Sequence, residues 1–369
     1  MKPPQLTLGI EEEYQIIDPE TRELAQMSDK LVERGAEVLQ DQIKPEFMRS
    51  QVEIGTRPCR DVAEARAEIV RLRSAVAALA RQEGLRMVAA STHPTSSWSR
   101  QELTSAARYE KLASDLKDVA RRLLIFGMHV HVGIEDPELR IDVLNQARYF
   151  IPHVLALSTS SPFWAGRDTG LKSYRSVIFE NMPRSGIPPT FGAYTDYENF
   201  VATLIETGCI EEPTKIWWDI RPHPEFPTLE FRMADVCTRV DEAICIAAVL
   251  QALVAKHIQL RRDNRSWRHY RHHLITENKW RAVRYGLDGK LIDFGARAEV
   301  PMRLLTLELL ELIDDVVDDL GSRQEIDYVH RILRDGSSAD RQLRTFRKTG
   351  DLHAVVDRLV AESVEGCDP

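Results

Sequence analysis

Near its N-terminus the chain reads Leu6-Thr-Leu-Gly-Ile-Glu-Glu-Glu-Tyr-Gln-Ile16, in which apolar and polar residues alternate. A β-strand turns successive side chains to opposite faces of its sheet, so Leu8 and Ile10 belong to one face and Glu11 and Glu13 to the other. The two carboxylates then lie about 7 Å apart along one strand. The sequence therefore predicts a strand with one apolar and one acidic face.

Residues that can bind metal or phosphate alternate with apolar residues in three later stretches. These are Phe47-Met-Arg-Ser-Gln-Val-Glu-Ile-Gly-Thr56, Gly127-Met-His-Val-His-Val-Gly133 and Thr228-Leu-Glu-Phe-Arg-Met-Ala234. The side chains opposite their apolar residues include Glu53, His129, His131, Glu230 and Arg232. If the strands share a sheet, carboxylates, imidazoles and a guanidinium gather on one face, which indicates a site for a divalent metal and phosphate.

Each stretch alone is also compatible with a half-solvated antiparallel strand whose polar residues meet water or pair across strands. The run Glu11-Glu12-Glu13 is harder to explain in this way, because acids are depleted in strands and three in a row repel one another. A positive partner is expected to compensate them, and a cation is the simplest one. Carboxylates with few imidazoles and no cysteine favour magnesium or manganese over zinc.

Four motifs occur together in the order of a known family. They are Gly9-Ile-Glu-Glu-Glu-Tyr14, Gly127-Met-His-Val-His-Val-Gly133, Leu229-Glu-Phe-Arg232 and Glu277-Asn-Lys-Trp-Arg-Ala-Val-Arg-Tyr-Gly286. In combination they resemble the type 2 glutamate–cysteine ligases, also called carboxylate–amine ligases. The resemblance implies a glutamine-synthetase-like fold of the α+β class. That fold has a mainly antiparallel sheet with the active site on one face, helices on the other face and a helical C-terminal region.

The same resemblance implies ATP-dependent amide formation through an acyl phosphate, with Mg²⁺ (or Mn²⁺) as the metal. It assigns metal binding to Glu11, Glu13, Glu53 and Glu230. It assigns substrate or nucleotide binding to His129, His131, Asn278, Arg281 and Tyr285. For binding of phosphoryl or carboxylate groups during catalysis it indicates Arg232, Arg175 and Arg184.

Arg175 and Arg184 lie in Pro162–Pro189, a segment rich in Gly, Pro, Ser and Arg without clear periodicity. Long irregular segments in compact enzymes are more often functional than idle, and guanidinium groups pair bidentately with carboxylate or phosphate. A solvated charged loop is the alternative. Arg221 is a further candidate for the basic set, with an ion pair to Asp219 as the alternative.

Apolar residues at helical spacing predict several helices. The predicted helices run from the cap Asp61 to residue 84 and over 109–124, 142–157, 194–207, 241–262 and 277–285. The pair Asp288-Gly289 predicts a hairpin turn, and Pro222–Thr228 predicts another. From residue 297 onward the pattern is helical. We expect a catalytic domain of residues 1–296, with a helical region of residues 297–369 packed on it.

Composition limits the partners and the compartment. The net charge of −8 and the pI near 5.8 give no general attraction to nucleic acid or anionic membranes. The basic, aromatic segment Arg261–His273 therefore fits a solvated helix end better than a nucleic-acid site. Five cysteines without Cys-x-x-Cys spacing indicate free thiols in a reducing compartment.

The N-terminus lacks an apolar signal core, and the apolar run 243–255 is shorter than a membrane span requires. We therefore expect a soluble cytoplasmic enzyme that acts on small molecules, and the family implies a homodimer. The sequence has no Walker A loop, so ATP is not expected to bind through a P-loop.

The predicted reaction is that of an ADP-forming carboxylate–amine ligase, with gamma-glutamylcysteine formed from glutamate and cysteine. One alternative is a metal-dependent amide hydrolase built around His129 and His131. Another is a ligase that acts on a different amine. A non-catalytic binding protein is disfavoured, because the acids are intact at all four metal positions.

Overall fold

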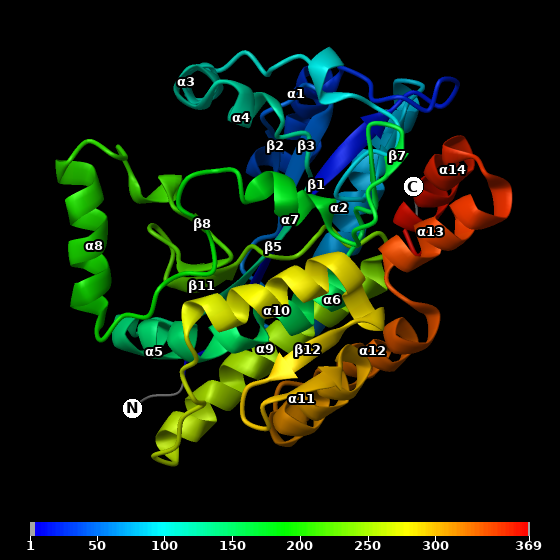
Figure 1. Ribbon diagram of the computed structural model, residues 1–369. Coiled ribbons are helices and arrows are strands. Elements are labelled where there is room, and N and C mark those ends of the chain that lie inside the picture. The colour runs from blue at the N-terminus through cyan, green and yellow to red at the C-terminus, as the bar shows by residue number, and fades with distance from the viewer. Residues whose placement is uncertain (1–3, 368–369) are drawn as a thin grey trace.

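A single antiparallel sheet organises the computed structural model, which describes residues 4–367 (Figure 1). Its strands follow the order β10-β11-β5-β1-β3-β2, with β4 also paired to β1. Their bounds are β1 Leu8–Ile17, β2 Ile43–Pro45, β3 Gln51–Gly55, β4 Arg86–Val88, β5 Met128–Gly133, β10 Ile220–Pro222 and β11 Thr228–Phe231. All pairs between these strands are antiparallel, so the mainly antiparallel sheet of the prediction is confirmed.

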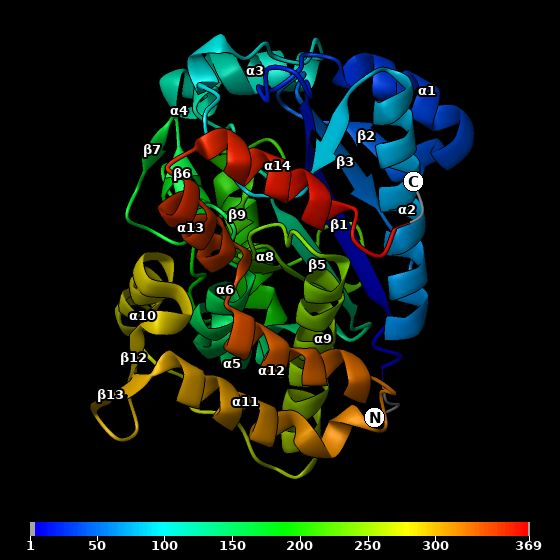
Figure 2. The same ribbon diagram turned by 90° about the vertical axis from the view of Figure 1, so that its right-hand side faces the viewer.

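Two long helices cover the apolar face of the sheet, α2 (Val62–Gln82) and α9 (Val240–Arg262) (Figure 2). Helix α2 begins after Asp61, whose side chain accepts a hydrogen bond from the Glu64 amide, as the sequence predicts. Helix α9 has 23 residues and, by length and composition, could cross a membrane, so the expectation that its apolar run is too short is wrong. Its most apolar window is 83% buried, which is typical of the core helix of a soluble protein.

The remaining elements surround this two-layer core. The other helices are α1 Ser28–Leu39, α3 Ala107–Leu116, α4 Asp118–Arg121, α5 Pro137–Ala147, α6 Ile151–Ser158, α7 Tyr174–Phe179, α8 Tyr194–Glu206, α10 His272–Tyr285, α11 Met302–Val317, α12 Arg323–Asp335, α13 Ser338–Thr349 and α14 Leu352–Ser363. The short strands are β6 Phe163–Trp164, β7 Arg167–Asp168, β8 Ser185–Gly186, β9 Trp217–Trp218, β12 Lys290–Asp293 and β13 Ala298–Pro301.

Three local predictions are wrong. The expected helix 109–124 is two helices, α3 and α4, with Lys117 at a positive φ of 49° between them. The expected helix 142–157 is two helices, α5 and α6, joined by a 3₁₀ turn at Arg148–Phe150. Pro152 follows this turn and cannot donate a backbone hydrogen bond, which explains the break. The Asp288-Gly289 pair does not form a hairpin turn, because Gly286–Asp288 is a 3₁₀ turn and the hairpin β12–β13 comes after it.

The C-terminal helices make specific polar contacts with the rest of the chain. Arg341 of α13 forms buried ion pairs with Glu242 at the start of α9 and with Glu362 of α14. The Ala89 amide, next to β4, donates a hydrogen bond of 2.9 Å to Ser363 Oγ. The expected boundary after residue 296 falls in the turn of the β12–β13 hairpin, and the division into two regions stays a prediction.

Glu12, the middle acid of the first strand, points into the core and meets Arg73 of α2. Both side chains are fully buried. Arg73 donates to Glu12 through Nε at 2.9 Å and Nη2 at 2.5 Å, and Tyr14 Oη donates to Glu12 Oε2 at 2.5 Å. Arg73 also donates to the carbonyls of Cys237 and Thr238 at 2.8 and 2.7 Å. One guanidinium thus joins the central strand to α2 and to the segment that leads into α9.

Replacing Arg73 by Met should lower the free energy of unfolding by about 3–5 kcal/mol, because it leaves the Glu12 carboxylate buried without its partner. Denaturant unfolding measures this loss. Arg71→Met is the matched control on the same helix, since its side chain is 43% exposed and pairs with Glu68. It should cost less than about 1 kcal/mol. An equal loss for both variants would contradict a structural role for the buried pair.

Candidate active site

Strand register brings the predicted polar residues together on the sheet face opposite α2 and α9. Glu13 lies opposite Glu53 in the β1–β3 pair, and Glu11 lies opposite His129 in the β1–β5 pair. In β11, Glu230 lies opposite His131 of β5 and Arg221 of β10. Alternation places these side chains on one face, so the sequence prediction of a shared chemical face is confirmed.

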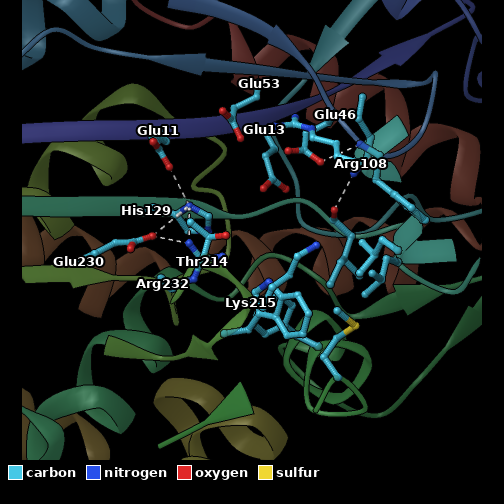
Figure 3. A pocket seen from close by; sticks show the side chains of 18 of the residues that line it. Glu11, Glu13, Glu46, Glu53, Arg108, His129, Thr214, Lys215, Glu230 and Arg232 are labelled. Atoms are coloured by element: carbon cyan, nitrogen blue, oxygen red, sulfur yellow. Dashed lines mark hydrogen bonds and ion pairs between the residues drawn. The ribbon is translucent and has the colours of Figure 1, made fainter. Parts of the chain in front are cut away.

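A cavity of about 360 Å³ lies over this face, and charged side chains from several strands, helices and turns point into it (Figure 3). Its acids are Glu11, Glu13, Glu46, Glu53, Glu212 and Glu230, and its cations are Arg108, Arg175, Lys215, Arg221 and Arg232. An apolar wall completes it, formed by Phe47, Tyr109, Leu112, Leu123, Ile125, Phe179, Met182 and Trp217.

Three carboxylates form one group in this cavity: Glu13, Glu46 and Glu53. One oxygen of each lies within 4.8 Å of the others. Burial and the neighbouring charge of Glu46 raise the pKa of Glu13 to about 8, although the Gly127 amide donates to it at 2.7 Å. Burial and the charges of the nearby acids raise the pKa of Glu53 well above its usual range. Ionisation of all three acids therefore requires more positive charge than their surroundings supply.

A second group combines Glu11, His131 and Glu230, with ligand atoms that also lie within 4.8 Å of one another. His131 Nε2 is buried without a hydrogen-bond partner and lies 3.7 Å from Glu11 Oε1. His131 Nδ1 lies 3.1 Å from Thr228 Oγ1, which fixes the ring and leaves Nε2 directed at the acids. An orphaned imidazole nitrogen beside two carboxylates is a donor set that suits a divalent cation.

Glu11 separates the first cavity from a second one of about 450 Å³, because its side chain lines both. The second cavity is lined by Thr7, Leu8, Gly9, Ile10, Asp41, Gln42, Lys44, Gly55, Thr56, Arg57, Pro58, His131, Gly133, Glu135, Phe226, Pro227 and Thr228. His129 holds Glu11 in this position, since its Nδ1 lies 3.0 Å from Glu11 Oε2.

Two arginines neutralise Glu230. Arg221 Nε donates to Glu230 Oε2 at 2.6 Å, and Arg232 Nη1 donates to Oε1. Burial alone would raise the pKa of Glu230, but the two guanidinium groups hold it well below its usual range. The alternative pairing of Arg221 with Asp219 is not formed, because Lys279 Nζ donates to both Asp219 oxygens at 2.8 and 2.7 Å.

Arg175 reaches the site along the edge of β5, where Gly127 leaves room for it. A Cβ on Gly127 would overlap Arg175 Nη2, so a larger residue there would displace the guanidinium. The Arg175 guanidinium donates to the Arg232 carbonyl at 3.2 Å and lies 5.3 Å from the Phe179 ring centre. Its Nε is buried without a partner, which leaves a donor available at the cavity.

The structure places four predicted site residues outside both cavities. Arg184 Nε donates to the Lys215 carbonyl at 3.1 Å, and its guanidinium lies over Trp217. Asn278 exchanges hydrogen bonds with the Ile292 backbone at 2.9 and 2.7 Å. Arg281 pairs with Glu277 and Glu299, and Tyr285 is 47% exposed. The contacts of Asn278 and Arg281 hold α10 against the β12–β13 hairpin, and a functional role for all four residues stays a prediction.

Sequence reasoning missed Glu46, Arg108 and Lys215, which all line the cavity. Glu46 directly follows the three-residue strand β2, whose Lys44 lies opposite Glu53. A strand that short gives almost no alternation signal, so nothing local marked the acid beside it. Arg108 and Lys215 come from α3 and from a turn before β9, where no periodic pattern predicts their direction.

The fold and site define the class of protein. The fold is that of the glutamate–cysteine ligases of known structure. The glutamate–cysteine ligase of Francisella tularensis in complex with AMP matches with a TM-score of 0.73 at 14% identity, covering 98% of this chain and 90% of that chain. A bifunctional glutathione synthetase from Pasteurella multocida matches with a TM-score of 0.67 at 15% identity, covering 98% and 53%.

Sequence comparison then gives the family. The family model "Glutamate-cysteine ligase family 2" matches residues 7–358. A protein of Chloroflexus aurantiacus named "Putative glutamate--cysteine ligase 2" is 58% identical over 360 residues, covering 98% of this chain and 92% of its own. A protein of the same name from Roseiflexus castenholzii is 57% identical, covering 98% and 95%. The chain belongs to glutamate–cysteine ligase family 2, so the predicted family is confirmed.

The acid group in the first cavity should bind Mn²⁺ or Mg²⁺, because three buried carboxylates lack matching positive charge. Titration calorimetry with Mn²⁺ should show binding to the native chain. Glu13→Gln and Glu53→Gln should each weaken it by more than the roughly tenfold cost of losing an outer-shell partner. Glu37→Gln, at an exposed position on α1, is the control. Native affinity in both site variants would contradict the assignment.

Proposed function

We propose that the protein is an ATP-dependent carboxylate–amine ligase that forms an amide through an acyl phosphate and releases ADP and phosphate. The observation that carries this proposal is the presence of two groups of possible metal ligands, one inside the first cavity and one, with Glu11 and His131, at the boundary with the second. Phosphoryl transfer between two substrates requires positive charge between two binding spaces and in-line positioning, with no covalent enzyme group. The site matches that requirement.

The nucleotide is assigned to the second cavity. This cavity has apolar and backbone surfaces for a flat base, contributed by Leu8, Gly9 and Phe226, and two cations at its wall, Lys44 and Arg57. Phe226 is 53% exposed and stacks on His223 with ring centres 4.6 Å apart, so its outer face is free for a base. The phosphates would then point towards Glu11, His131 and Glu230.

The acid and the amine are assigned to the first cavity. Arg175 and Arg232 lie at the sheet surface, where they can hold a carboxylate and the phosphoryl group that it receives. Farther out, Glu46 and Arg108 present opposite charges, which suits the ammonium and carboxylate of a second amino acid. Glutamate and cysteine are the substrates named for the relatives, and we propose gamma-glutamylcysteine as the product. A different amine is the alternative.

The residues fit Mg²⁺ at two positions: Glu13, Glu46 and Glu53 would hold one ion, and Glu11, His131 and Glu230 another. Such ions neutralise charge that develops on phosphoryl oxygens. Arg232 is positioned by Glu230 and lies 3.4 Å from His129 Nδ1, so it faces the same space between the cavities. Its guanidinium can keep its contact with the phosphoryl group while that group is transferred from ATP to the substrate carboxylate.

In the proposed sequence the substrate carboxylate attacks the γ-phosphorus, and the bond to the β-phosphate oxygen breaks to release ADP. The amine nitrogen then attacks the carbonyl carbon of the acyl phosphate, and phosphate leaves as the amide forms.

A metal-dependent hydrolase is not favoured by any contact. His129 Nδ1 is engaged by Glu11, and only His131 belongs to a possible ligand set.

Incubation with ATP, magnesium, glutamate and hydroxylamine should trap a hydroxamate. Arg232→Lys keeps the charge but loses the planar donor pair. The rate of trapping should therefore fall by the factor that corresponds to a loss of about 2–4 kcal/mol in transition-state stabilisation. Arg334→Lys, at a position 71% exposed on α12 and outside the cavities, serves as the comparison and should trap at the native rate. The assay must be repeated with several amino and dicarboxylic acids. ATP-independent amide cleavage without any hydroxamate would show that the protein is a hydrolase.

Phe226→Ala should raise the KM for ATP by roughly five- to hundredfold, as expected for loss of a base–aromatic stack, and leave the KM for glutamate unchanged. Steady-state ATP turnover with each substrate varied in turn separates the two constants. Trp280→Ala removes an aromatic ring that is 49% exposed on α10 and should change neither. An increase in the KM for glutamate alone would reverse the assignment of the two cavities.

We further propose a cytoplasmic homodimer. Four cysteines, Cys59, Cys209, Cys237 and Cys245, are free thiols, which fits a reducing compartment. Exposed apolar side chains on α10 and α11, namely Leu274, Trp280, Tyr285, Leu304 and Leu307, offer a surface for a second copy.

A further inference from the structure

A third cavity, of about 200 Å³, lies between the α5–α6 turn, the segment before α10, and α11. It is separate from the sheet face, and it shares no lining residue with the two cavities above. Its walls are aromatic and aliphatic, with two acids. They consist of Tyr149, Phe150, His153, Trp267, Tyr270, Asp293, Leu305, Glu308, Leu309 and Leu312.

Aromatic rings form a continuous surface around this space. The Tyr149 ring lies 5.5 Å from Trp267 and 5.2 Å from Tyr270, measured between ring centres. Phe150 lies 5.0 Å from Trp267. The interplanar angles of these three pairs are between 35° and 49°, so the rings are tilted and leave faces as well as edges at the cavity. Aromatic faces attract cations.

Buried polar atoms at this cavity have no partner. His153 is 2% exposed, and its Nδ1 makes no hydrogen bond. Trp267 Nε1 is also buried and unpaired. Burial lowers the pKa of His153 to about 4, so its ring is neutral at pH 7. One ring nitrogen can therefore accept a hydrogen bond. Unpaired buried polar groups are rare in folded proteins and call for a partner.

The charge at the cavity is negative. Asp293 and Glu308 are its two charged lining residues among those described, and no lysine or arginine lines it. Burial, and then the charge of Asp293, raise the pKa of the Tyr149 hydroxyl, and Glu308 adds to this effect. Arg268 lies over the Tyr270 ring at 5.7 Å but does not line the cavity.

These walls explain the aromatic residues of the basic segment Arg261–His273. Its Trp267 and Tyr270 do not form an exposed surface for nucleic-acid bases, because both line this cavity together with Tyr149. The structure therefore gives the aromatic residues a role that differs from that of the basic residues between them.

We propose that this cavity is a binding site for a small organic ammonium ion with an apolar body. The ammonium group pairs with Glu308 and Asp293 and donates to the neutral His153 ring, while the body packs against the aromatic rings and leucines. A volume of about 200 Å³ admits a ligand the size of benzylamine. The site does not depend on the proposed ligase activity.

The test is calorimetric titration of the full chain with benzylammonium in the absence of ATP. Saturable binding is expected, and benzyl alcohol, which has the same shape without the charge, should bind at least about tenfold more weakly, as expected when a cation–π contact and an ion pair are lost. Equal binding of both probes would overturn the proposal, because it would show an apolar cavity with no preference for a cation. Absence of binding would overturn it as well.

Two variants locate the bound probe. Tyr270→Leu removes one aromatic face and should weaken binding roughly tenfold, and Glu308→Gln should weaken it about threefold, because the lost charge is exposed. Glu311→Gln, exposed on the same helix and outside the cavity, is the matched control.

Since the proposed enzyme acts on amines, Glu46→Gln tests for binding in the first cavity. Binding lost in Glu46→Gln and retained in Glu308→Gln and Tyr270→Leu would overturn the proposal.

Discussion

The buried pair of Glu12 with Arg73 is the interaction on which the arrangement of the sheet and its helices depends. Desolvating two charges is costly, and the pair is stable only because every donor of the guanidinium finds an acceptor nearby. Those acceptors belong to the central strand, to the segment before α9 and to Ser363 at the end of α14, so the contacts of one arginine hold α2, α9 and α14 against the sheet. The helices that cover the apolar face are therefore fixed by a polar contact as well as by packing.

The same strand gains its chemistry from the positions on either side of Glu12. Because side chains alternate, fixing Glu12 towards the helices turns Glu11 and Glu13 to the opposite face. A register slip of one residue would bury both acids and expose Glu12, and Arg73 would lose its partner. The structural pair thus selects the register in which His129 lies opposite Glu11 and Glu53 lies opposite Glu13.

The sequence could predict the parts of the site that lie on regular strands. Period-2 alternation identified Glu11, Glu13, Glu53, His131 and Glu230 without any knowledge of tertiary structure, and the register then brought them together. It also indicated that the run of three acids needs positive partners, and Glu12 has one in Arg73. It could not tell which acid has which partner. The partner of Glu12 is an arginine 61 residues later, on a helix, whereas the other two acids face the cavity.

Residues from irregular or short segments were beyond such reasoning. Glu46 directly follows a three-residue strand, and Lys215 ends a 3₁₀ turn, so neither has a periodic pattern that fixes its direction. The position of predicted residues outside both cavities has the same cause, and their functional role stays a prediction. Arg281 and Asn278 lie on a helix in a family motif, but helical spacing alone does not tell which face meets a cavity and which one holds the β12–β13 hairpin.

The two acid groups differ in a way that assigns them different tasks. Glu230 is matched by two arginines, so the group around His131 already carries positive charge next to the space where phosphates are proposed to bind. Glu13, Glu46 and Glu53 have no such match, and their raised pKa values reflect mutual repulsion and burial. Repulsion of this kind is relieved by a cation or by the ammonium group of a substrate. Electrostatics therefore orders the site, with anions drawn towards the arginines and cations towards the carboxylates, and Glu11 lies on the boundary between them.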